Sequence, residues 1–184
     1  MKPQICIIAI LFTLLSFSQE NWELKENKDN IQVFTKDVVN SKIKQYRAIT
    51  TVDQSLEKVV NTILDADKIK EWNYKTTESY LIKKESDSIH YIYMYNDLPW
   101  PVLNRDFISK LTVTSISEKS IKIIIEPGDN SLVPEKDGVI RMSEFKGYWL
   151  IESLNGKTKI TQEIYGNPEG NLPSFFVNST LVKA

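Results

Sequence analysis

The chain has 184 residues, and 41% of them are apolar, which fits a single globular domain. Its formal net charge is −1, from 23 basic and 24 acidic side chains. Without a dense basic cluster, this balance argues against nucleic-acid binding and against strong attraction to anionic lipid surfaces.

The first 18 residues are predicted to be a secretory signal peptide. Lys2 precedes an apolar run over residues 5–15, and residues 16–18 resemble a small-x-small cleavage site. A run of that length is too short to span a bilayer as a helix, so cleavage is favoured over an uncleaved anchor. We therefore expect an exported protein, periplasmic or secreted, that folds over residues 19–184. Cys6 lies in the removed segment, which leaves no thiol for catalysis or metal binding.

The first half of the domain is predicted to begin with strands and then turn helical. Segments 21–26 and 31–38 flank a polar turn and indicate a hairpin, and residues 43–52 form a long alternating strand. Asp53 then suits a helix N-cap. The helix that follows has one apolar face, formed by Leu56, Val59, Val60, Ile63 and Leu64. A short second helix is expected over residues 67–72.

The second half is predicted to be a meander of strands. The expected strands are 76–84, 89–96, 105–117, 121–126, 139–154 and 157–165. Residues 97–104 hold two prolines around Trp100, which excludes both strand and helix there. Residues 127–138 form a long polar loop. The last two strands are expected to pair across Asn155-Gly156, because both residues tolerate positive φ.

A closing helix is expected after Gly170. Asn171 can cap it, and Pro173 fits an early helical position. Its apolar side chains form two arcs, one of Leu172, Phe175, Phe176 and Val182 and the other of Val177, Leu181 and Ala184. A helix covered on two sides can contact the sheet on one side and a ligand or a neighbouring element on the other. The whole order predicts an α+β fold with a strongly curved antiparallel sheet.

From Trp22 onward the sequence resembles the START family, the steroidogenic-acute-regulatory-related lipid transfer domains. Several features carry the resemblance by their order and spacing. They are Trp72 after the helical pair, the proline loop before Arg105-Asp106-Phe107, Val139-Ile140-Arg141 before Gly147-Tyr148-Trp149, and Thr158–Tyr165 before the segment 172–178.

The resemblance implies a helix-grip fold, in which a helical pair is inserted and a C-terminal helix closes an apolar cavity. It implies that residues 97–104 form the loop at the mouth and that residues 173–184 form the gripping helix. It also implies binding, and transfer, of a lipid or other hydrophobic small molecule. Separately, we expect no cofactor, transient membrane contact and a monomer. Little chain separates the expected cleavage site from Trp22, and the closing helix has about 12 residues, roughly 18 Å. Many members of the family have an additional N-terminal helix and a much longer closing helix. Either the sequence is cut short or this member has a short lid, and the second case argues against tight enclosure of a large phospholipid.

Nine residues are assigned as candidate lipid-binding residues. They are Tyr93, Trp100, Arg105, Phe107, Arg141, Trp149, Phe175, Phe176 and Thr180.

The charged candidates each have a structural alternative. An inward Arg105 would hold a ligand hydroxyl, carboxylate or phosphate, whereas an ion pair of Arg105 or Asp106 would instead pin the proline loop. Arg141 either faces a ligand head group or pairs across the sheet with a carboxylate such as Glu144 or Glu163.

The aromatic candidates are also ambiguous. Trp100 either sits at a membrane interface or tucks onto the core. Tyr91, Tyr93 and Tyr95 share one strand face, which either lines the cavity or packs outward under a loop.

The alternative function is a cyclase- or hydratase-like enzyme on the same scaffold. It would need cavity acids or bases such as Asp106, His90 or Tyr93. His90, the single histidine, has no nucleophile or metal-ligand partner in the sequence pattern. A third possibility is a partner-binding module whose interior is filled.

Overall fold

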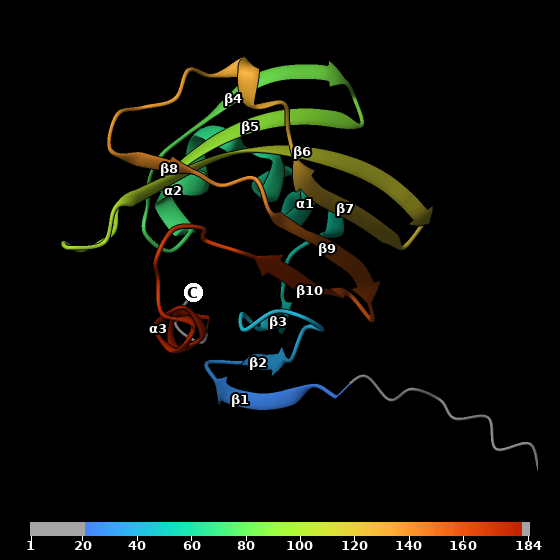
Figure 1. Cartoon of the computed structure of the whole chain (residues 1–184). Coiled ribbons are helices and arrows are strands. Elements are labelled where there is room, and N and C mark those ends of the chain that lie inside the picture. Colours follow the sequence, from blue (N-terminus) through green and yellow to red (C-terminus); the bar gives the residue numbers. More distant parts are fainter. Residues whose placement is uncertain (1–20, 182–184) are drawn as a thin grey trace, which may run out of the picture.

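A strongly curved sheet makes up most of the computed structural model, which describes residues 21–181 (Figure 1). Across these residues the strand order is β1-β2-β3-β10-β9-β7-β6-β5-β4, and β8 pairs with β6 outside this path. The two ends of the order do not pair, so the sheet is not closed. The strands are β1 (Glu23–Lys28), β2 (Ile31–Lys36), β3 (Gln45–Val52), β4 (Thr76–Ser86), β5 (Ile89–Asn96), β6 (Asn104–Ser117), β7 (Ser120–Pro127), β8 (Val139–Arg141), β9 (Phe145–Leu154) and β10 (Lys157–Gly166).

Two helices fill the space inside the curve, between β4–β6 and the strands β9 and β10 (Figure 1). They are α1 (Leu56–Leu64) and α2 (Ile69–Trp72), and a short 3-10 turn, Ala66–Lys68, joins them. Val59, Val60 and Ile63 are buried, as the helical spacing predicted. The expected cap was wrong by two residues, because the Ser55 hydroxyl, not Asp53, accepts from the Lys58 N–H at 3.2 Å.

The antiparallel α+β prediction is confirmed, with one error of connectivity. Asn155 and Gly156 have φ of 51° and 81° and form the tight turn between β9 and β10. The expected strand 139–154 is instead broken into β8 and β9. β8 runs parallel to β6, and Arg141 lies opposite Asp106.

The closing helix, α3, is shorter than expected and covers Ser174–Thr180. Pro173, not Asn171, is its N-cap residue, because a proline fixes the extended entry into the first turn. Val177 is buried against Ile43 and Tyr165. Val182 and Ala184, which complete the two expected apolar arcs, lie outside the described residues.

Gly147 leaves no room for a side chain between β9 and β10. A Cβ at this position would lie 2.3 Å from the carbonyl oxygen of Glu163 and 3.1 Å from the Ile164 Cα. We expect Gly147→Ala to lower the free energy of unfolding by about 1–3 kcal/mol, because one backbone has to move. Urea denaturation measures it, with Gly166→Ala as the control, since its nearest neighbour would lie 3.4 Å away. Equal stability of the two variants would contradict the prediction.

Candidate functional site

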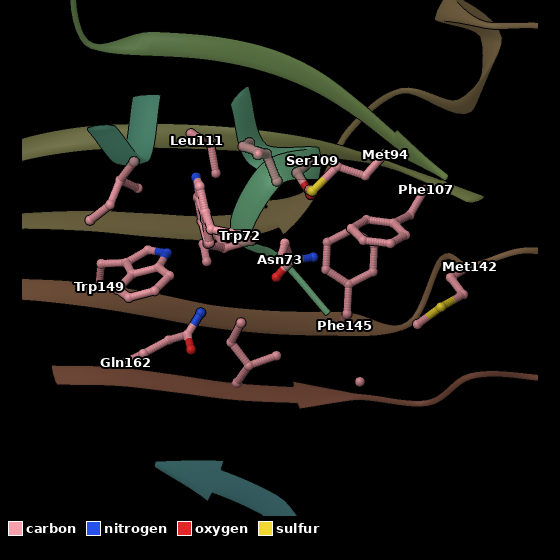
Figure 2. Close-up of a pocket in the computed structure, with 15 residues that line it drawn as sticks. Trp72, Asn73, Met94, Phe107, Ser109, Leu111, Met142, Phe145, Trp149 and Gln162 are labelled. Atoms are coloured by element: carbon pink, nitrogen blue, oxygen red, sulfur yellow. The ribbon is translucent and has the colours of Figure 1, made fainter. Parts of the chain in front are cut away.

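An apolar cavity of about 150 Å³, the inner pocket, lies between the helices and the concave face of the sheet (Figure 2). It is lined by Ile63, Ile69, Trp72, Asn73, Met94, Phe107, Ser109, Leu111, Ile125, Met142, Phe145, Trp149, Gln162, Ile164 and Gly166. No charged side chain is among these residues. The interior is therefore not filled, which argues against the module with a collapsed cavity.

Aromatic side chains give the inner pocket its walls. Trp72 and Trp149 meet edge to face, with ring centroids 6.2 Å apart, and Phe107 meets Phe145 in the same way at 5.6 Å. Phe107 and Trp149, two of the candidate residues, therefore lie in the pocket wall. Such pairs fix the shape of a cavity, because each ring is held by its neighbour.

Two further cavities continue the inner pocket at either end. The outer pocket, about 460 Å³, shares Met142 with it and is lined by Tyr74, Lys75, Asn96, Leu98, Pro99, Arg105, Met142, Pro168, Leu172, Phe176, Val177, Ser179, Thr180 and Leu181. The far pocket, about 390 Å³, shares Ile63, Trp72 and Trp149 with the inner pocket. The three form a row along the inside of the sheet, as an elongated apolar ligand would require.

The outer pocket brings together the two elements assigned to the mouth. Leu98 and Pro99 come from the proline loop, and Phe176 and Thr180 come from α3. The candidates Arg105, Phe176 and Thr180 thus lie in one lining. Asn178 holds α3 in place: its amide nitrogen donates to the Lys42 carbonyl at 3.0 Å, and its amide oxygen accepts from the Lys44 N–H at 2.9 Å.

Arg105 is buried at the edge of the outer pocket, where it donates hydrogen bonds to backbone carbonyls and not to a carboxylate. Its guanidinium donates to the carbonyls of Leu103, Pro168 and Glu169. These bonds tie the end of the proline loop to the segment before α3, so Arg105 pins that loop without an ion pair. Of the two residues expected to form one, Asp106 does so instead, with Arg141. Burial lowers the pKa of Arg105.

Arg141 pairs with Asp106 and not with Glu144 or Glu163. Its Nε lies 2.7 Å from Asp106 Oδ1, and its Nη2 lies 2.8 Å from Asp106 Oδ2, a bidentate geometry. The Tyr93 hydroxyl also donates to Asp106 Oδ2, at 2.9 Å. The sequence did not indicate this partner, because the parallel pairing of β8 with β6 was not foreseen.

This charged cluster fastens the 127–138 loop over the convex face of the sheet (Figure 1). Arg141 donates to the carbonyls of Asn130, Val133 and Pro134 at 3.0–3.3 Å. Because Asp106 and its neighbour Arg105 point to opposite faces, one secures this loop while the other reaches the outer pocket. Arg141 is therefore placed outside the three pocket linings.

Tyr91, Tyr93 and Tyr95, which share one face of β5, lie on the same convex face of the sheet. Tyr93 is fully buried and stacks on Tyr80 with centroids 4.9 Å apart, and Lys136 lies 5.1 Å from the Tyr93 ring centroid. Burial, with a smaller contribution from the hydrogen bond to Asp106, raises the pKa of Tyr93 to about 12. The opposite face of β5 supplies Met94 to the inner pocket, so Tyr93 is not placed among the cavity residues.

Trp100 and Phe175 lie outside the three pocket linings. Trp100 is 92% exposed and Phe175 is 76% exposed, and Leu103 beside the loop is 53% exposed. We call these three residues the mouth patch, because the proline loop and α3 both border the outer pocket. Trp100 therefore does not tuck onto the core.

Three polar pocket residues were missed from the sequence: Asn73, Ser109 and Gln162. Ser109 is fully buried, and its hydroxyl is without a hydrogen-bond partner among the described residues. Ser109 follows Phe107 by two positions in the same strand, so face alternation alone would have placed it beside that candidate. Met142, which lies between β8 and β9 and lines two pockets, had no comparable signal in the sequence, because the break between these strands was not predicted.

Catalytic and metal-ligating groups do not converge on these pockets. His90 is buried outside the three linings, and its pKa is lowered first by burial and then by Lys84. In residues 21–181 no cluster of His, Cys, Asp or Glu is arranged to hold a metal ion. The same residues contain no helix with the length and apolarity needed to cross a membrane.

Known proteins are similar in sequence to this chain over most of its length. The START domain family model matches residues 4–183. An uncharacterized protein of Pseudomonas aeruginosa is 28% identical over 166 residues, which cover 90% of this chain and 81% of that protein. The phosphatidylcholine transfer protein of Mus musculus is 24% identical over 163 residues, which cover 86% of this chain and 75% of that protein.

Solved structures share the architecture. A STAR-related lipid transfer protein from Xanthomonas axonopodis superposes with a TM-score of 0.81 at 26% identity, covering 88% of this chain and 90% of that one. Human StAR-related lipid transfer protein 5 gives a TM-score of 0.76 at 20% identity, covering 91% and 82% of the two chains. At that identity the second comparison shows the fold alone.

Proposed function

The chain belongs to the START domain family, and from that premise we propose that it binds and transfers a lipid or another hydrophobic small molecule. The observation that carries the proposal is the row of three cavities inside the sheet, whose central member has no charged lining. Each methylene moved from water into such a cavity contributes about 0.8 kcal/mol, so affinity needs little polar chemistry. Relatives named as lipid transfer proteins support the same function.

Native mass spectrometry of the protein purified from its own host, followed by solvent extraction, tests the proposal. We expect a stoichiometric bound lipid or lipid-like molecule. A mass without ligand, together with no uptake from mixed liposomes, would overturn lipid binding.

The geometry favours a carrier over the cyclase- or hydratase-like alternative. That alternative requires an acid or base facing the bound molecule, and its candidates were Asp106, His90 and Tyr93. Asp106 and Tyr93 bond to each other on the convex face, and His90 is outside the three linings.

We further propose that the protein is exported after removal of residues 1–18. The support is the charge and apolar pattern of that segment in the sequence. Mass spectrometry of the N-terminus from periplasm or medium is expected to show a chain that begins near Gln19. A chain that retains Met1 in the cytoplasm would contradict export.

Ligand exchange is proposed to occur with the mouth patch in contact with a membrane. Exposed indole and phenyl rings beside the outer pocket favour insertion at the bilayer interface. We expect Trp100→Ala with Phe175→Ala to slow vesicle-to-vesicle transfer roughly tenfold, since two aromatic anchors are lost. Lipid binding in solution should not change.

A matched control for this membrane contact is Ile116→Ala. Ile116 is 58% exposed near the end of β6 and lies outside the three pocket linings. Transfer by the control should equal that of the wild type. An equal loss in both variants would show that exposed apolar area matters wherever it lies.

Opening of α3 is proposed to control release. Asn178→Ala removes two hydrogen bonds that hold the helix, worth about 1–2 kcal/mol together, which corresponds to a roughly 5- to 30-fold faster ligand dissociation. Stopped-flow dissociation of a fluorescent lipid measures it. Asn171→Ala, at an exposed position before the helix, is the control, and equal rates in both variants would contradict a lid role for α3.

A further inference from the structure

We infer that the outer pocket receives the anionic end of an amphiphile, a carboxylate or a phosphate, at Arg105, with the hydrocarbon portion in the inner pocket. This inference rests on the proposed function and specifies the ligand class. Its evidence is a buried cation that lacks a countercharge, together with the distribution of charge along the row of cavities.

Arg105 differs from the other arginines of the chain in how its charge is balanced. Arg47 pairs with Glu163, and Arg141 forms a bidentate pair with Asp106. Arg105 is 3% exposed, yet no carboxylate of residues 21–181 lies within 4.0 Å of it. A buried guanidinium stays charged, so it normally requires an anion nearby.

The nearest candidate for that countercharge is turned away. The backbone carbonyl of Glu169 accepts from Arg105, but its carboxylate accepts from the N–H and the hydroxyl of Ser143, each at 2.8 Å. The protein thus brings an acidic residue to the guanidinium and directs its charge elsewhere. Within residues 21–181 the Arg105 guanidinium is therefore left without a carboxylate partner.

Arg105 has donors for an external anion. A guanidinium carries five N–H groups, and carbonyls take one each from Nε, Nη1 and Nη2. One N–H remains on each terminal nitrogen. Two donors of this kind match the two oxygens of a carboxylate or phosphate.

The outer and inner pockets differ in charge as the two ends of an anionic amphiphile do, and the far pocket beyond them has one charged lining residue, Lys58. The outer pocket contains two basic side chains, Arg105 and Lys75, and no acidic one, while Asn96, Ser179 and Thr180 add polar atoms. The inner pocket, reached past Met142, has no charged lining. A ligand with a negative end and an apolar tail would therefore satisfy both pockets at once.

The test compares cis-parinaric acid with its methyl ester, which has the same chain but no charge, by fluorescence titration at pH 8. We expect the acid to bind at least tenfold more tightly. Equal affinities in this pair and in the phosphate pair described below would overturn the inference and leave the proposed function intact. Binding of neither probe, nor of any lipid extracted with the protein, would overturn both.

Variants locate the charge effect. Arg105→Gln should reduce the affinity for the acid to near that for the ester, with a much smaller change in the affinity for the ester. Because Arg105 also ties two loops, its thermal unfolding is measured in parallel. Lys75→Gln, at an exposed position, provides the second variant and should weaken binding of the acid alone, about two- to threefold. Loss of ester binding in a folded Arg105→Gln protein would contradict the assignment.

The nature of the anion is decided by a second pair, lysophosphatidic acid and monoacylglycerol with the same chain. Tighter binding of lysophosphatidic acid than of cis-parinaric acid would assign a phosphate. The reverse order would assign a carboxylate. No preference for the charged member in either pair would overturn the inference.

Discussion

Asp106→Ala is expected to lower the free energy of unfolding by about 3–5 kcal/mol, because it leaves the Arg141 guanidinium buried without a countercharge. The Asp106 side chain is 1% exposed, and that of Arg141 is 5% exposed, so water cannot replace the lost carboxylate. The variant also removes the acceptor of the Tyr93 hydroxyl. Urea denaturation at neutral pH measures the change.

Two controls separate the buried charge from loss of packing. Replacing both partners, Asp106→Leu with Arg141→Met, should recover most of the stability, since no charge is then buried. Asp87→Ala breaks an exposed ion pair with Lys84 and should leave the unfolding curve unchanged within error. A double variant as unstable as Asp106→Ala would show that packing and the lost hydrogen bonds, not charge, account for the loss.

The elements of the fold were largely accessible from the sequence because local patterns encode them. The α1 stripe, the Asn155-Gly156 turn and the proline-interrupted loop each have a short-range cause in side-chain spacing or backbone φ. Cap positions were less accurate. Ser55 took a role that Asp53 suited equally well on residue type, and Pro173 took one for which Asn171 was the better candidate.

The candidate site was less accessible because it depends on which strands pair. Arg141 meets Asp106 through the parallel contact of β8 with β6, which joins positions 35 residues apart. Face alternation showed that Tyr93 and Met94 point in opposite directions, but not which face is concave. That choice depends on the helices packing on the Met94 side, a long-range contact without a local signal.

Because neighbouring residues of a strand point to opposite faces, Arg105 and Asp106 have different roles. Asp106 belongs to the convex face and holds the 127–138 loop, whereas Arg105 belongs to the concave face and borders the outer pocket. The ion pair of Asp106 with Arg141 thus anchors the loop, whereas Arg105 remains in the outer pocket as a cation without a carboxylate partner among residues 21–181. A sequence shows both charges side by side and cannot show this division.

Gly166→Leu is expected to reduce lipid uptake roughly tenfold by blocking the passage between the inner and outer pockets. A Cβ at Gly166 would lie 3.4 Å from the Phe145 Cβ and 3.7 Å from the Met142 Cε, both ordinary contacts, so the backbone accepts a side chain. Phe145 lines the inner pocket, and Met142 lines both pockets. Displacing about two ligand methylenes at about 0.8 kcal/mol each corresponds to a loss of roughly tenfold or slightly more.

Gly166→Ala is the matched control, because it adds the Cβ alone and should retain uptake close to that of the wild type. Uptake is measured by titration with a fluorescent lipid, and thermal unfolding confirms that both variants fold. Full uptake by a folded Gly166→Leu protein would mean that the ligand does not pass Met142. The inner pocket would then have to fill from its other end, past Trp72 and Trp149, where it adjoins the far pocket.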